Sequence, residues 1–163
     1  MAKNEKPEET KPMSQFTSHM ETALNQARAA ASRGEIPVGA VIVAPDGKII
    51  AQAGNRTRES NDPTAHAEIL AIRAACAALK TERLTGYDLY VTLEPCPMCA
   101  MAISAARLNR LYYGASDPKS GGIAQGPRVL SHPQAHHVPE IYDGISAPQS
   151  EELLKSFFKK RRS

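Results

Sequence analysis

The sequence predicts a single α/β domain that combines antiparallel and parallel strand pairing. Its 163 residues provide enough chain for one core of ordinary size and too little for two. Two short apolar runs, 38–44 and 48–53, flank a Pro-Asp-Gly turn, which is typical of a β-hairpin. Further along, strand-like runs at 89–93 and 111–113 enclose a helical segment, and this order favours parallel pairing.

Helices are predicted on both sides of the hairpin. Ser18 and Glu21 have the spacing of a capping box, and apolar residues recur at helical intervals until Gly34, so we expect a helix over 19–33. A second helix has His66 in its first turn. Its apolar face is formed by Ile69, Ile72, Cys76 and Leu79.

The second half of the chain predicts a third helix, a long loop, an edge strand and a last helix. The third helix begins at the Cys96–Cys99 segment and ends near Leu108. Residues 117–134 contain glycines, prolines and polar side chains, as long surface loops do. The strand over 138–142 contains a proline and is therefore expected at a sheet edge, and Ser150 is expected to cap the final helix.

Composition argues against a membrane-spanning protein and against a disulfide framework. Hydrophobic residues make up 42% of the chain, and no apolar run approaches the roughly 20 residues that a membrane-spanning helix needs. Two of the three cysteines form a CxxC, which favours metal or redox use. Residues 1–15 are polar, without the apolar stretch of a secretory signal. We therefore expect a flexible N-terminal tail, one domain over 16–163 and a cytoplasmic location.

The carboxyl end is locally basic, although the net charge is only +3. Phe157 and Phe158 are followed by Lys159, Lys160, Arg161 and Arg162. The simpler explanation is that bases in a last helical turn complement the helix dipole. The alternative is a phosphate-binding tail.

His66, Cys96 and Cys99 are the candidate metal ligands. The two cysteines are three residues apart, so in one helical turn both sulfurs can bind the same ion. At a helix N-terminus the dipole lowers the thiol pKa and favours the thiolates that zinc requires. One imidazole and two thiolates leave a fourth tetrahedral position for water, as in a catalytic zinc site.

Glu68 distinguishes a catalytic site from a structural one. The three ligands already satisfy zinc, so this carboxylate is available to carry protons between water and substrate. An HxE followed by PCxxC is the signature of zinc-dependent deaminases, which indicates hydrolytic deamination. On a straight helix His66 and Glu68 would point about 200° apart, so the helix must meet the metal end-on.

Each part of the pattern also has a simpler interpretation. A CxxC alone is equally typical of a redox pair or of half a zinc ribbon. Cys76 lies on an apolar helix face and is interpreted as core filling. The remaining histidines are expected at the surface or in loops rather than at the metal; those considered are His19, His136 and His137.

The HAE and PCxxC motifs alone indicate only the cytidine deaminase superfamily. Further specific segments are EIPVGA at 35–40 and YVTLEPCPMC at 90–99, and the branch is narrowed by DPTAHAE at 62–68, the YYGASDPK stretch and the FFKKRR ending. On these motifs the chain resembles, from about residue 20 to residue 162, the bacterial tRNA-specific adenosine deaminases of that superfamily.

The resemblance implies a three-layer cytidine-deaminase-like fold, with a mixed five-stranded sheet flanked by helices. It also implies a homodimer with one zinc ion per subunit, bound by His66, Cys96 and Cys99, with Glu68 as proton shuttle. The implied reaction converts adenosine to inosine at the wobble position of a tRNA anticodon stem-loop, with an arginine tRNA as the expected substrate. The implied pocket and flanking-nucleotide contacts are Asn55, the Ala67 backbone, Ile36, Pro37, Asp117, Lys119 and His132. The basic ending, with Phe157 and Phe158, is expected near the anticodon stem.

Two other functions remain open. A guanine, cytosine or nucleoside deaminase would share the zinc signature, but the basic Phe-Phe helix and Asp117-Pro118-Lys119 favour an RNA substrate. A noncatalytic zinc-stabilised RNA-binding protein would have no use for Glu68. The segment SGGIAQGPRVL at 120–130 and Val138-Pro139 depart from the family pattern, whereas the metal ligands and Glu68 match it.

Overall fold

The computed structural model describes residues 17–161, so the predicted tail at 1–15 and the basic residue Arg162 lie outside the described residues. The elements are α1 (Met20–Ser32), β1 (Gly39–Val43), β2 (Ile49–Gly54), α2 (Ala67–Leu79), β3 (Asp88–Leu93), α3 (Pro97–Ala105), β4 (Arg110–Ala115), the 3-10 helix η1 (Val129–Ser131), β5 (Glu140–Tyr142) and α4 (Ala147–Arg161). The predicted α/β class is therefore confirmed.

The five strands form one mixed sheet in the order β2-β1-β3-β4-β5. β1 pairs antiparallel with β2 and with β3, whereas β3–β4 and β4–β5 are parallel. The hairpin and the parallel strand–helix–strand unit are thus both confirmed, and β5 lies at an edge as predicted.

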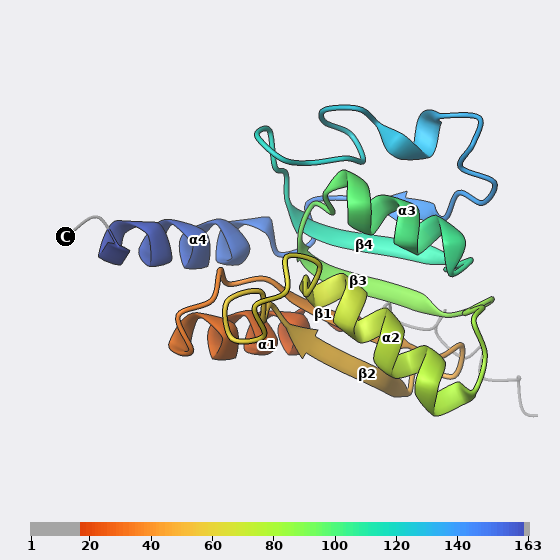
Figure 1. Cartoon of the computed structure of the whole chain (residues 1–163), viewed down its shortest axis with the longest axis horizontal. Helices are drawn as coiled ribbons and strands as arrows, with labels where there is room; N and C mark the ends of the chain where they lie inside the picture. The colour runs from red at the N-terminus through yellow and green to blue at the C-terminus, as the bar shows by residue number, and fades with distance from the viewer. Residues whose placement is uncertain (1–16, 162–163) are drawn as a thin grey trace, which may run out of the picture.

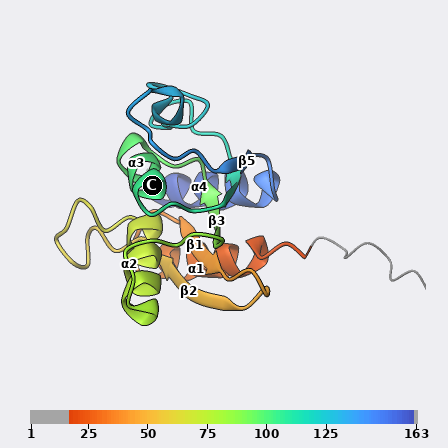
Figure 2. The same ribbon diagram turned by 90° about the vertical axis from the view of Figure 1, so that its right-hand side faces the viewer.

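Helices cover both faces of the sheet and produce three layers (Figures 1 and 2). Side chains alternate between the faces: in β1, Ala40 and Ile42 join the core beneath α2 and α3, whereas Val41 and Val43 join the core beneath α1. α4 packs on β3, β4 and α1, which places the carboxyl-terminal helix on the α1 side.

Local boundaries differ from the prediction where a contact or a turn ends an element. α3 ends at Ala105 rather than near residue 108, because Arg107 is left-handed (φ 62). At the start of α1, Ser18 Oγ accepts a bond from the Met20 N–H, but Glu21 pairs with Arg28 instead of completing the capping box. The capping box is therefore only half formed.

The prediction that Ser150 caps the last helix is wrong. α4 begins at Ala147, so Ser150 lies inside it, buried, and its hydroxyl donates to the backbone oxygen of Thr92. This bond joins the first turn of α4 to β3. Among the described residues, none of the helices is both long enough and apolar enough to cross a bilayer.

Candidate active site

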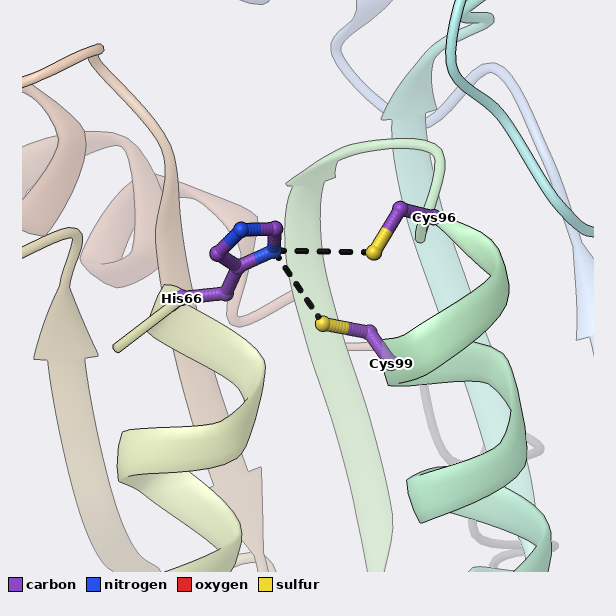
Figure 3. Close-up of side chains that lie close together, drawn as sticks. All are labelled: His66, Cys96 and Cys99. Atoms are coloured by element: carbon purple, nitrogen blue, oxygen red, sulfur yellow. Dashed lines mark hydrogen bonds between the residues drawn. The ribbon is translucent and has the colours of Figure 1, made fainter. Parts of the chain in front are cut away.

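Two helix N-termini meet at the carboxyl end of β3 and bring the predicted ligands together. His66 is the N-cap residue of α2 and Cys96 that of α3, both in extended conformation, and Cys99 lies in the first turn of α3. Figure 3 shows the imidazole and the two sulfurs pointing toward one another from the two helices. α2 meets the site end-on, as the assignment of Glu68 required.

The geometry of the triad fits zinc. His66 Nδ1 lies 3.5 Å from the sulfur of Cys96 and 3.5 Å from that of Cys99. In a tetrahedral site with Zn–S of about 2.3 Å and Zn–N of about 2.0 Å, nitrogen and sulfur lie about 3.5 Å apart. Among residues 17–161 no other set of three such side chains comes within ligand distance. The triad can therefore hold one zinc ion.

The pKa values of the two thiols are shifted in opposite directions. The pKa of Cys96 is lowered to about 4, because the Cys99 thiol donates a hydrogen bond to it and His66 adds to the effect, although burial opposes it. The same hydrogen bond, together with burial, raises the pKa of Cys99. The Cys96 thiol is therefore the readier of the two to lose its proton, and a bound cation would displace the proton of Cys99.

Glu68 lies in the first turn of α2, 3% exposed, and lines the same pocket as His66 and Cys96. Burial raises the pKa of its carboxyl above the ordinary value, while backbone hydrogen bonding and the His66 charge oppose this effect. A carboxyl that holds a proton more firmly than usual suits a group that accepts and returns protons.

The pocket above the triad encloses about 650 Å³, which is within the usual range for a small-molecule site. Asn55 is 8% exposed, and its amide oxygen accepts the Ala67 N–H at 2.8 Å, so its amide nitrogen is left for a ligand. Other predicted residues that line the pocket are Ile36, Asp117, Lys119 and Phe158.

Several predicted residues do not line this pocket. Pro37 and Ala67 are buried next to lining residues, and His132 is exposed at the end of η1, where its Nδ1 accepts the Gln134 N–H. Phe157 is buried beneath the Arg161 guanidinium, 4.8 Å from its ring centre. Lys159, Lys160 and Arg161 are exposed in the last turn of α4. The substrate roles of these residues remain predictions.

Three side chains that the sequence analysis assigned to the core, the surface or loops lie away from the metal triad. Cys76 packs partly buried against the core, and His137 Nε2 bonds to the Leu108 carbonyl at 2.6 Å. His19 contacts the Tyr90 ring edge-on. These contacts give each residue a structural role away from the metal triad.

The sequence analysis did not identify several residues that line the pocket or hold its loops. Leu154 of α4 lines it beside Phe158, and Ser116, Ser120 and Thr57 also line it. Two buried carboxylates accept backbone N–H groups from loops that contribute to the pocket. Glu35 binds the loop at residues 58–59, and Glu94 binds the loop at residues 117–125. Glu94 directly follows a buried strand and precedes the candidate ligand Cys96 by two residues, a position that could have indicated it, whereas nothing local indicated Leu154.

Glu35→Ala is expected to lower the free energy of unfolding at pH 7 by about 1–3 kcal/mol, because the Arg58 and Glu59 amides would lose a buried acceptor. Burial alone would raise the pKa of Glu35, but these backbone bonds and Arg33 hold it below 4.5. A carboxyl with a lowered native pKa stabilises the fold above its unfolded pKa, and this contribution disappears as pH falls through the native pKa. Urea unfolding should therefore show the difference shrinking below about pH 4.

The control for this prediction is Glu21→Ala, which removes an exposed carboxylate paired with Arg28. Exposed pairs contribute about 0–1 kcal/mol, so this variant should unfold nearly as the parent does. Equal losses in both variants would contradict a specific role for Glu35.

Comparison with known proteins agrees with the geometry. Residues 13–115 match the family model described as the cytidine and deoxycytidylate deaminase zinc-binding region. A tRNA-specific adenosine deaminase of Agrobacterium fabrum is 57% identical over 150 residues, which cover 92% of this chain and 98% of that one.

Two solved structures of deaminases are similar to this chain. A structure from studies of A-to-I editing by tRNA:A34 deaminases at the wobble position aligns with TM-score 0.81 and 60% identity, over 83% of this chain and 97% of that one. A Bacillus subtilis guanine deaminase aligns with TM-score 0.59 and 30% identity, over 90% and 96% of the two chains. The chain therefore belongs to the cytidine and deoxycytidylate deaminase family, among relatives named tRNA-specific adenosine deaminases.

Proposed function

We propose that this protein is a zinc-dependent hydrolase that converts adenosine to inosine at the wobble position of a tRNA anticodon. The observation that carries the proposal is the buried Glu68 carboxyl in the same pocket as a His-Cys-Cys triad of zinc dimensions. Identity of 57% to a tRNA-specific adenosine deaminase supports the substrate class.

His66, Cys96 and Cys99 would hold one zinc ion per subunit. Zinc bound here would supply a water of lowered pKa as the nucleophile for attack on C6 of the adenine. Glu68 would take a proton from that water and deliver it to the ring nitrogen, and would then carry the remaining hydroxyl proton to the C6 amino group, which leaves as ammonia as the C6 carbonyl forms. The apolar wall of the pocket, formed by Ile36, Val38, Leu93, Leu154 and Phe158, would exclude bulk water from the base.

Substrate selection would come from the rim of the pocket. The Asn55 amide would hydrogen-bond the flipped base, and the side chains of Asp117 and Lys119 would face neighbouring nucleotides. Bases in an anticodon loop are only partly stacked, so extrusion costs less than the few kcal/mol that a duplex demands. A homodimer and a cytoplasmic location are further parts of the proposal, supported by the family resemblance and by the nature of the substrate.

Removing the chain from Lys159 onward is expected to weaken tRNA binding and flatten its salt dependence. Each lost phosphate contact should lower the slope of log K against log salt by about 0.7 to 0.9. Fluorescence anisotropy with an anticodon stem-loop at several salt concentrations measures the slope. Lys48→Gln is the control, because Lys48 lies in the turn between β1 and β2, at the end of the sheet away from the metal triad. An unchanged slope in the truncated chain would leave only helix capping for the basic ending.

The decisive assay incubates zinc-loaded protein with an arginine tRNA transcript carrying adenosine at the wobble position, and with free guanine, cytosine and adenosine in parallel. Inosine confined to the wobble position is the expected product. Ammonia from a free base alone would instead favour the guanine-deaminase type of activity, for which the Bacillus subtilis structure is the precedent. Stem-loop binding with zinc but no turnover would indicate a noncatalytic RNA-binding protein.

A further inference from the structure

The Glu94 carboxylate is buried directly after β3, and both of its oxygens accept hydrogen bonds from one loop. It is 2% exposed. Its Oε1 accepts the Ser116 hydroxyl at 3.2 Å and the Asp117 N–H at 3.1 Å. Its Oε2 accepts three consecutive N–H groups, those of residues 123–125, at 3.0–3.2 Å. One side chain therefore ties both ends of the loop 116–125 to the strand that precedes the metal ligands.

The loop packs against Glu94 and the CxxC segment too closely for side chains at two positions. A Cβ on Gly121 would lie 2.6 Å from a Glu94 carboxylate oxygen, and a Cβ on Gly122 would lie 2.6 Å from the Pro97 nitrogen. The Gly122 N–H also donates to the Pro95 carbonyl at 2.8 Å. The path of the loop is thus fixed by direct contact with the segment that carries the ligands.

This same loop forms one wall of the pocket. Its lining residues are Ser116, Asp117, Lys119 and Ser120. The Asp117 side chain in turn accepts the N–H groups of Lys119 and Ser120, at 3.2 and 3.0 Å, so the orientation of the wall depends on where Glu94 holds Asp117. Part of the loop falls in 120–130, the segment in which the chain departs from the family pattern.

We propose that Glu94 is a positioning residue that sets substrate affinity by holding the wall 116–125, without contacting the reacting atoms. The inference rests on the proposed function, because the RNA proposed to meet this wall is the substrate of that function. Glu35 makes comparable bonds to another loop, which contributes Thr57 to the pocket lining: it is 1% exposed and accepts the N–H groups of Arg58 and Glu59, at 3.1 and 2.8 Å. This loop therefore serves as an internal comparison for the loop held by Glu94.

Glu94→Gln tests the proposal with little change of volume. Whichever way the new amide turns, its nitrogen faces either the Asp117 N–H or the three N–H groups of 123–125, donor against donor. Hydrogen exchange should accelerate at least about tenfold at whichever of these amides faces the nitrogen, while exchange at residues 58 and 59 stays unchanged. Glu35→Ala is the crossed control and should give the reverse pattern at the two loops.

Activity provides the second readout. KM for an anticodon stem-loop should rise at least about tenfold in Glu94→Gln, with kcat within about threefold of the parent and zinc content unchanged. Gly121→Ala disturbs the contact between Glu94 and the loop from the loop side. If Glu94→Gln does not fold, Gly121→Ala provides the test in its place. Unchanged exchange at 117 and 123–125, or a loss confined to kcat, would overturn the proposal. Exchange is measured without substrate, so it reports on Glu94 even if the protein fails to edit tRNA.

Discussion

Glu68→Gln is expected to lower kcat by at least about a thousandfold while the protein keeps about one zinc per chain. General acid–base catalysis contributes about 10²–10⁴ in rate, and the glutamine amide can neither accept the proton of the nucleophilic water nor return it. Because Glu68 is buried in the first turn of α2, the nearly isosteric amide preserves the packing around His66. Inosine formation on a wobble-adenosine tRNA and metal analysis of the same sample measure the two quantities.

The control for this prediction is Glu21→Gln, which makes the same chemical change on the exposed surface of α1 and should retain parental kcat. Full activity in Glu68→Gln would remove the proton shuttle from the mechanism. Loss of zinc together with activity would mean that Glu68 acts through the metal site instead.

Cys96→Ser is expected to remove both zinc and activity. The sulfur lies 3.5 Å from His66 Nδ1 and carries the more acidic of the two thiols, so its loss leaves only two ligands, too few for a stable zinc site. Zinc content should fall below about a tenth of an ion per chain, and turnover should fall at least about a thousandfold. The melting temperature should also fall, because the metal links the N-termini of α2 and α3.

The third cysteine supplies a matched control. Cys76→Ser makes the same substitution on α2, against the core and away from the triad, and should keep zinc and activity. Treating the parent protein with a chelator and then restoring zinc should remove and return activity without any mutation. Zinc retained in Cys96→Ser, or lost in Cys76→Ser, would contradict the assignment of the ligands.

Features that depend on residues close together in the chain could be predicted before the fold was known. The CxxC spacing placed two sulfurs on one helical turn, and the hairpin and the strand–helix–strand order gave both kinds of strand pairing, which the structure confirms. The requirement that α2 meet the metal end-on followed from the angle between His66 and Glu68, and Figure 3 shows that approach for His66. The three-layer arrangement of a five-stranded sheet between helices, by contrast, was expected only from the resemblance to a known family.

The surroundings of the triad, by contrast, depend on contacts between residues far apart in the chain. Ser150 was predicted to cap a helix but is bonded to Thr92, 58 residues away in the chain, and Glu94 binds a loop 22 to 31 residues further on. Leu154 and Phe158 reach the pocket because α4 packs beside α1, while His132 stays outside it. Periodicity and capping describe contacts within about one helical turn, whereas these contacts depend on how distant elements pack. The candidate ligands and the reaction type could therefore be predicted from the residues, whereas the walls of the pocket required the fold.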